Sequence, residues 1–363
     1  MKPVVHHRPA GIALIIVMIC ITVLALLAAG FAYSMKVETK LAQNSGSDTE
    51  MTWLGLSGVE LARYVLAQQM AVTQEPYDAL NQVWAGGPGS MFATNTPLAF
   101  ISLDNYELGN GRFSVKIVDL ERKWNINAGP DQLRERVFEQ ALRLIGVDAG
   151  DFTAIANAIL DWTDADDLER IGGAESHYYE TLDPPYFAKN LPIDDLSELL
   201  LVRGVTPEIY WGPSAASHPQ SAFQNRLGFV RPGSALAHPV GLVDLFTPLS
   251  TGRINLNTAS LMTLQLIPFV DENIASEIIR LRSGPDGVDG TEDDTPFSNP
   301  GELINVPGMN PQIIPELQRM CDVRSRTFEV QVDVEIGSYK RQFFAILGRN
   351  SPRDVQILSF YWK

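Results

Sequence analysis

The chain has 363 residues, enough for two or three units of ordinary domain size. Apolar residues make up 45% of it, so it can build hydrophobic cores and wholesale disorder is excluded. A formal net charge of −15 argues against a polyanion as partner. Cys20 lies inside an apolar run and Cys321 near the other end of the chain, so we expect no disulfide between them.

The N-terminal stretch is the most informative part of the sequence. Residues 1–11 are basic and end in glycine, and residues 12–33 follow without a charge. As a helix that run spans roughly 33 Å, which is enough to cross a bilayer. Amphipathic spacing continues beyond it, so we expect one helix over residues 12–72. The alternatives are a signal peptide cleaved near residues 28–30 and an ordinary membrane anchor.

This N-terminus resembles the leader of type IV prepilins. In that family a membrane peptidase cuts after the leader glycine, here Gly11, and the new terminal residue, here Ile12, is methylated. The family usually has a glutamate at the fifth mature position, where this chain has Ile16. Lack of that acid is typical of one subfamily, the K-type minor pseudopilins of type II secretion. In a shaft subunit this glutamate is thought to pair with the terminal amine of the neighbouring subunit, because a charge in the bilayer needs a partner. A first subunit has no predecessor and therefore needs no such glutamate.

The segments that follow predict a helix, a loop region and a sheet. Weak helix formers at residues 44–50 predict a kink or break, and glycine and proline at 76–111 predict a loop-rich connection. Apolar and polar residues alternate, as in half-buried strands, at 111–119, 327–336, 340–347 and 355–362, with a hairpin turn at Gly337-Ser338. A long helix followed by an antiparallel meander is the pilin architecture, so residues from about 120 to 325 form an insertion into that sheet.

The inserted region contains an internal duplication. Residues 124–128 (WNINA) recur as 254–259 (INLNTA), residues 155–160 (IANAIL) as 274–279 (IASEII), and a series of apolar and glycine positions within 185–205 recurs within 296–309. Each copy predicts short helices separated by tight turns. Their order resembles the paired helix-hairpin-helix, or SAM-like, units of the K-type pseudopilins, so the resemblance covers nearly the whole chain.

The resemblance implies an α+β fold. It consists of a pilin-like long N-terminal transmembrane helix and an antiparallel sheet, with a large, mostly α-helical insertion of two helix-hairpin-helix/SAM-like units. The expected divisions are a prepilin leader at 1–11, the N-terminal helix at 12–72, a connection with the first strand at 73–120, a first SAM-like unit at 121–215, a second at 216–325 and the C-terminal strands at 326–363.

An acidic segment in the first unit is a candidate metal site. Four carboxylates within residues 161–167 (DWTDADD) repel one another unless they are solvated or share a hard cation. Ca²⁺ takes about six to eight oxygen ligands in flexible geometry, which suits closely spaced aspartates. The K-type family carries a similar D-W-x-D-x-D stretch followed by G-A-E, and calcium binding is described for it. The resemblance therefore implies Ca²⁺ ligands at Asp161, Asp164, Asp166, Asp167 and Glu175, with a solvated acidic turn as the alternative.

A second acidic loop lies at residues 284–294 (GPDGVDGTEDD). Its alternation of glycine and aspartate resembles calcium loops without matching the EF-hand pattern. The candidate ligands are Asp286, Asp289, Asp293 and Asp294, and an ordinary exposed turn is the alternative.

Charge and motif content argue against two other classes of function. Helix-hairpin-helix units often hold DNA phosphates, so a membrane-anchored DNA receptor competes with the pseudopilin interpretation. Residues 253–323 contain 4 basic and 11 acidic residues, however, which opposes phosphate binding. The sequence has no nucleophile elbow, phosphate-binding loop or cysteine-rich metal motif, so we expect no enzyme activity.

The resemblance implies a minor pseudopilin of a type II protein secretion system, which caps the tip of the periplasmic pseudopilus and helps to initiate its assembly. The implied partners are other minor pseudopilins, the inner-membrane platform, prepilin peptidase and the membrane, without nucleic acid. We expect a single-pass protein of the bacterial inner membrane with a cytoplasmic N-terminus and a periplasmic bulk. A minor pilin of a type IV pilus or a competence system is the alternative.

Overall fold

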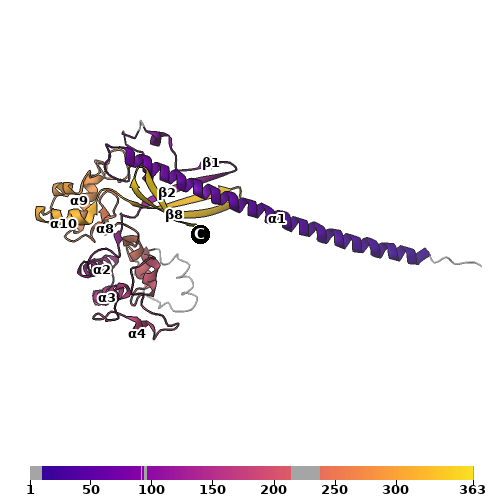
Figure 1. Ribbon diagram of the computed structural model, residues 1–363, viewed down its shortest axis with the longest axis horizontal. Coiled ribbons are helices and arrows are strands. Elements are labelled where there is room, and N and C mark those ends of the chain that lie inside the picture. The colour runs from indigo at the N-terminus through magenta and orange to yellow at the C-terminus, as the bar shows by residue number, and fades with distance from the viewer. Residues whose placement is uncertain (1–9, 91, 94–95, 214–237, 363) are drawn as a thin grey trace, which may run out of the picture.

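A long helix projects from a body formed by a sheet and two groups of short helices (Figure 1). The computed structural model describes residues 10–90, 92–93, 96–213 and 238–362. Most of the expected leader, residues 1–9, and the expected boundary between the two inserted units near residue 215 therefore lie outside the described residues.

Helix α1 runs from Ala10 to Ala71 without interruption. The kink expected at residues 44–50 is wrong, because those residues keep helical backbone. Weak helix formers cost only about 1 kcal/mol each at most, and the packed C-terminal half of the helix supports them. The first half, from Ala13 on, is long and apolar enough to cross a membrane, and its most apolar stretch is entirely exposed.

The sheet has five antiparallel strands in the order β1-β2-β7-β8-β9. The four strands expected from alternating residues are confirmed, with a turn at residues 337–338 between β7 and β8. Strand β1 was not expected, because it is short and lies in the loop-rich connection. In that connection it follows two 3-10 helices, η1 (Val83–Ala85) and η2 (Pro97–Phe100), and precedes β2. The strands are β1 (Tyr106–Leu108), β2 (Gly111–Asp119), β7 (Thr327–Ile336), β8 (Tyr339–Ser351) and β9 (Asp354–Trp362).

The C-terminal half of α1 packs on one face of this sheet. Val59 and Leu66 of the helix and Val332 and Phe343 of the sheet are fully buried in one apolar core. The close approach depends on Gly55, where an added Cβ would lie 2.6 Å from the Phe343 ring. The amphipathic second half of α1 therefore completes the core of the sheet.

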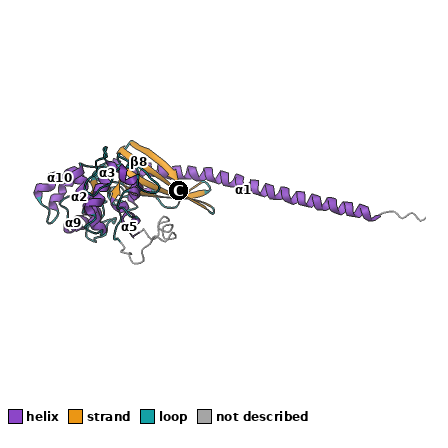
Figure 2. Cartoon of the chain, turned by 90° about the horizontal axis from the view of Figure 1, so that it is seen from below, coloured by secondary structure: helices purple, strands orange, loops and turns teal. Residues whose placement is uncertain are grey.

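The insertion begins and ends at neighbouring strand ends. Asp119, the last residue of β2, is paired with Phe328 near the start of β7. Its helices share one continuous apolar core and gather at the end of the body away from the projecting part of α1 (Figure 2). In chain order they are α2 (Asp131–Ile145), α3 (Phe152–Thr163), α4 (Ser176–Tyr179), η3 (Leu196–Leu201), α5 (Pro207–Trp211), α7 (Leu242–Leu245), α8 (Leu261–Leu264), α9 (Glu272–Arg282), η5 (Pro300–Asn305), η6 (Pro311–Ile313) and α10 (Ile314–Met320).

The sequence duplication corresponds to duplicated contacts. The side-chain amide of Asn127 donates to the Ile193 carbonyl and accepts from its N–H, both at 2.9 Å. Asn257 makes the same pair with Phe297, at 2.9 and 2.8 Å. Each copy also opens with a two-residue parallel bridge, β3 (Trp124–Asn125) with β4 (Phe246–Thr247) and β5 (Ile254–Asn255) with β6 (Cys321–Asp322). In each copy, an asparagine side chain thus ties two distant loops together through the same pair of hydrogen bonds.

A buried polar cluster joins the insertion to the sheet. Arg349 of β8 is 1% exposed and is ion-paired to Asp78, which is also buried. The same guanidinium donates to the Ser325 carbonyl at 2.7 Å. Asp119 accepts from the hydroxyls of Ser325 and Thr258, both at 2.7 Å. These contacts fix the base of the insertion against the strand ends, since buried charges persist only when they are paired and hydrogen-bonded.

Candidate functional site

Three acidic side chains meet where α3 ends and the following loop returns. Asp161, Asp164 and Glu175 each offer a carboxylate oxygen, and these atoms lie within 4.8 Å of one another. Asp161 and Glu175 are fully buried, whereas the Asp164 side chain is 19% exposed. Such a group of oxygens on one side of a loop is the donor set that hard divalent cations prefer.

Asp161 organises the loop from the last turn of α3. Its carboxylate accepts from the backbone N–H of Ala174 at 3.0 Å and from that of Arg170 at 3.2 Å. The loop passes so close that a Cβ on Gly173 would collide with the same carboxylate. Glycine at this position therefore permits Glu175, two residues later, to reach the cluster.

Arg170 supplies the positive charge within this group. Its guanidinium is ion-paired with Asp164 and, at 2.8 Å, with Asp161. The other terminal nitrogen lies 2.9 Å from a carboxylate oxygen of Asp131, at the start of α2. One arginine thus faces several carboxylates, so the cluster keeps an excess of negative charge.

Glu175 is a buried carboxylate that lacks hydrogen-bond donors in the described part of the chain. Neither of its carboxylate oxygens has a hydrogen-bond partner among the described residues, and one oxygen of Asp164 is unpartnered in the same way. Burial, followed by the charges of Asp161 and Asp164, raises the pKa of Glu175 to about 7. A buried carboxylate without donors is costly, and a bound cation would supply the missing interactions. The residues present therefore fit a divalent cation.

Asp166 and Asp167 do not join the other three expected ligands. Asp166 accepts from the backbone N–H of Leu168 at 2.9 Å. Asp167 accepts from Asn190 at 3.1 Å and from Ser176 at 3.3 Å. Both are exposed and stabilise the turn, so the structure brings together three of the five residues expected from the sequence.

The second acidic loop uses its carboxylates internally. Asp289 is ion-paired with the buried Arg282, at 2.6 Å. Asp293 accepts from the backbone N–H of Asp286 at 3.0 Å, and Asp294 from that of Gly290 at 2.8 Å. Across the described part of the chain, the three-carboxylate grouping occurs at the first site and not in this loop.

Sequence reasoning missed the basic partners of both loops. Arg170 and Arg282 each lie a few residues from the aspartates that they neutralise, and this proximity was the available signal. For the expected processing site, the structure gives only the backbone: Gly11 and Ile12 lie in the first turn of α1.

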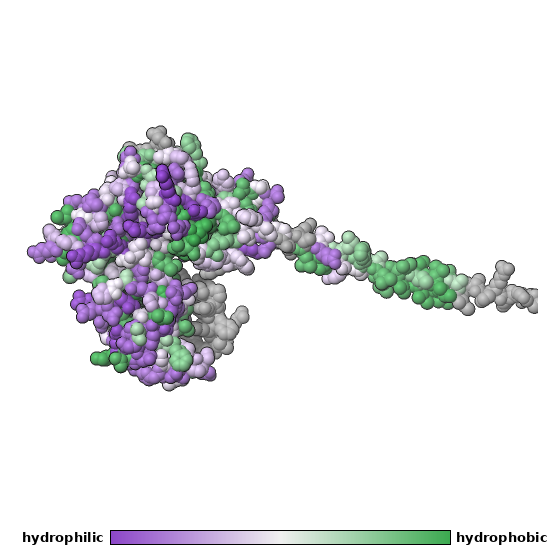
Figure 3. Space-filling view, in the orientation of Figure 1, coloured by the Kyte–Doolittle hydropathy of each residue, from purple (hydrophilic) through white to green (hydrophobic). Residues whose placement is uncertain are grey.

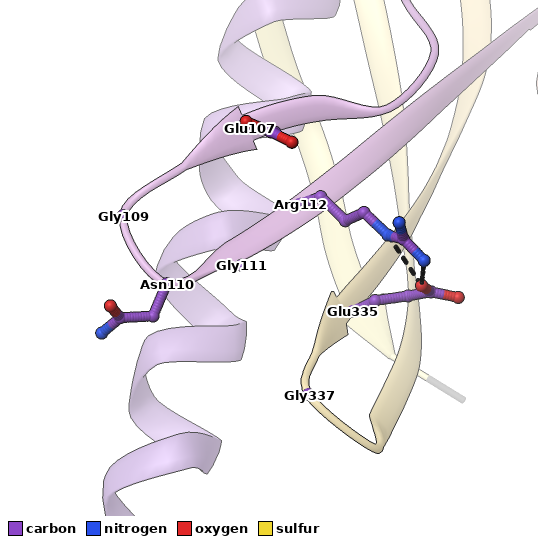
Figure 4. Close-up of a pocket in the computed structure, with 7 residues that line it drawn as sticks. All are labelled: Glu107, Gly109, Asn110, Gly111, Arg112, Glu335 and Gly337. Carbon is purple, nitrogen blue, oxygen red and sulfur yellow. Dashed lines mark hydrogen bonds and ion pairs between the residues drawn. The ribbon is translucent and has the colours of Figure 1, made fainter.

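An open hollow lies between the β1–β2 and β7–β8 turns (Figure 4). Arg112 and Glu335 face each other across neighbouring strands, with the arginine Nε 2.8 Å from a carboxylate oxygen. Because the charges of Arg112 and Glu335 neutralise each other, this ion pair does not indicate a binding site for a charged ligand.

Three comparisons agree with this architecture. Residues 111–211 match the family model described as type II secretion system (T2SS), protein K. The type II secretion system protein K of Aeromonas hydrophila is 22% identical and aligns over 97% of this chain and 96% of its own. The protein of the same name from Pseudomonas aeruginosa is 23% identical, over 96% and 91%.

Among solved structures, the crystal structure of the GspK-GspI-GspJ complex from the enterotoxigenic Escherichia coli type 2 secretion system contains a similar chain. The two chains superpose with a TM-score of 0.62 at 16% identity, over 89% of this chain and 99% of the other. At that identity the likeness establishes the fold.

Proposed function

We propose that this chain is a structural, non-enzymatic minor pseudopilin of the type II secretion system protein K family and that it caps a periplasmic pseudopilus. The observation that carries the proposal is the division of α1: an exposed apolar half long enough to span a membrane continues into a half that packs on an antiparallel sheet. This arrangement couples a membrane anchor to an extracytoplasmic body. We place the anchor in the inner membrane, with the N-terminus cytoplasmic.

The insertion supports a position at the tip. In Figure 1 its helices lie at the end of the body away from the apolar half of α1. A subunit stacked beyond this end in a shaft would meet that bulk, whereas a tip has free space there. Ile16 supports the same position, because a first subunit needs no acid to pair with a preceding amine. The duplicated asparagine contacts further support two helix-hairpin-helix-like units in the insertion.

We propose that the partners are other minor pseudopilins, as in the solved complex of a similar chain. The prepilin peptidase and the inner-membrane platform complete the proposed set. The test is deletion of the gene in its own bacterium: secreted enzymes should accumulate in the periplasm, and the wild-type gene should restore their release. Normal secretion combined with loss of surface pili or of DNA uptake would favour the pilus or competence alternative.

We also propose that Asp161, Asp164 and Glu175 hold Ca²⁺. The unpartnered oxygens of Glu175 support this proposal, and Arg170 would yield part of its contact with the aspartates when the ion binds. The ion would supply positive charge that ties the end of α3 to the returning loop. A calcium titration of the purified chain by calorimetry tests it: one saturable site is expected, and no heat of binding would contradict the proposal.

A further inference from the structure

The two edges of the sheet differ in their protection. One edge is β1, which has three residues and is therefore too short to template another strand. The other edge is β9, with nine residues. Between Val355 and Tyr361 it has no charged residue, proline or glycine, which are among the devices that usually blunt an edge, although Leu358 is an extra residue in the register of β9 with β8. Among the described residues, no backbone–backbone hydrogen bond joins β9 to a segment other than β8; at the start of the strand, the Arg63 side chain of α1 donates to the Val355 carbonyl at 2.9 Å.

Large apolar side chains accompany this free backbone. Leu358 and Trp362 are each 61% exposed, and Tyr361 is 41% exposed. Figure 3 shows apolar surface in the region where Figure 1 places the C-terminus. The end of β9 also reaches α1: the Arg341 guanidinium lies 4.7 Å from the centre of the Trp362 ring and is ion-paired with Asp48. Backbone groups and apolar side chains are thus available together, as in edges that receive an added strand.

Membrane anchoring argues against a second copy as the occupant. Two identical edge strands pair antiparallel about a two-fold axis perpendicular to the sheet. Because α1 lies against the sheet face, that axis would also reverse α1, and the two apolar anchors would point in opposite directions. Two chains in one membrane cannot adopt this arrangement. The occupant is therefore a strand from a different chain.

We propose that the free edge of β9 is a docking site for a β-strand of another minor pseudopilin, which extends the sheet beyond its fifth strand. This inference rests on the proposed function for the nature of the partner, and on the edge itself for the mode of binding. Main-chain hydrogen bonds would provide affinity, and the side chains of Leu358 and Trp362 would provide specificity.

Hydrogen exchange tests the mode of binding directly. The full-length chain in detergent is compared alone and after co-purification with the other minor pseudopilins of its own secretion system. Amides of residues 355–362 should exchange at least about tenfold more slowly in the complex, because outward N–H groups become hydrogen-bonded. The β1 edge should be unchanged.

Substitutions then test the edge in the same complex. Leu358→Lys places a charge on an exposed edge position and should weaken association about tenfold without changing the melting temperature of the chain alone. If that variant does not fold, Ser359→Lys at the next exposed position serves instead. The matched control is Ile171→Lys, where the native side chain is 91% exposed in the insertion; association should stay at the wild-type level.

The outcomes separate this inference from the proposed function. A stable complex in which residues 355–362 remain unprotected and Leu358→Lys binds normally overturns strand docking and leaves the pseudopilin role intact. Failure of the chain to associate with the other minor pseudopilins overturns both. Protection of β9 in a homodimer would overturn the choice of partner.

Discussion

Calcium should raise the thermal stability of this protein. A ligand that binds only the folded state stabilises it by RT ln(1 + [L]/Kd), which is about 2.7 kcal/mol at a hundredfold excess over Kd. For a body of this size each kcal/mol shifts Tm by about 2–4 °C. The full-length chain in detergent should therefore melt about 5–10 °C higher with excess Ca²⁺ than with EGTA, as measured by scanning calorimetry.

Substitutions at the cluster assign that shift to the site. Glu175→Gln should abolish the calcium effect, because it removes the ligand whose two oxygens lack other partners. In EGTA the same variant should be at least as stable as wild type above pH 7, since it removes a buried charge. Asp166→Asn is the matched control: its carboxylate lies outside the cluster, so the calcium shift should persist.

The pH dependence follows from the raised pKa of Glu175. Without metal, its pKa is about 7 in the folded chain and near the ordinary 4.5 in the unfolded chain. The folded state then binds more protons between these values, so stability falls as pH rises from about 4.5 to about 7. Glu121, whose pKa burial also raises to about 7, acts in the same direction, and the difference between wild type and Glu175→Gln isolates the site.

Calcium binds the deprotonated carboxylate, so its stabilising effect should grow over the same pH range. Identical melting curves with Ca²⁺ and EGTA at pH 8 would refute this account of the cluster and leave a solvated acidic turn. A shift that survives Glu175→Gln would place the ion elsewhere.

Three further predictions concern other parts of the chain. Intact-mass analysis of the membrane-extracted protein should give a methylated form beginning at Ile12, cut after Gly11; a form retaining Met1 would contradict the leader interpretation. Arg349→Ala should destabilise the fold by about 3–5 kcal/mol in urea denaturation, because it leaves the buried Asp78 unpaired; a loss below about 1 kcal/mol would contradict that role. Gly55→Ala should cost about 1–3 kcal/mol in the same assay, because the added methyl meets a ring of β8, and an unchanged midpoint would mean that the helix can move away.

The sheet could be predicted because its strands follow one simple physical rule. In β7 every second side chain is buried against α1, so apolar and polar residues alternate in the sequence. The buried residues are Phe328, Val330, Val332 and Val334. The unbroken course of α1 through residues 44–50 could not be predicted, because local propensity opposes it and the support comes from packing further along the helix.

The candidate metal site could be predicted only in part from the sequence. The density of acidic residues located it, but spacing alone cannot say which carboxylates point inward. Asp161 and Glu175 do so because α3 ends inside the core and Gly173 lets the loop close over it. Asp166 and Asp167 lie on the outer side of the same turn, and that division depends on tertiary structure.

The position of the subunit in the fibre is the central claim, and gold labelling tests it most directly. Cys321 is buried, so the label requires an exposed thiol: Glu316→Cys on α10, in a Cys20→Ser background. The parent with only Cys321 controls for unspecific labelling. In electron micrographs of overproduced pseudopili, gold should mark one end of each fibre. Gold distributed along the shaft would contradict the tip assignment.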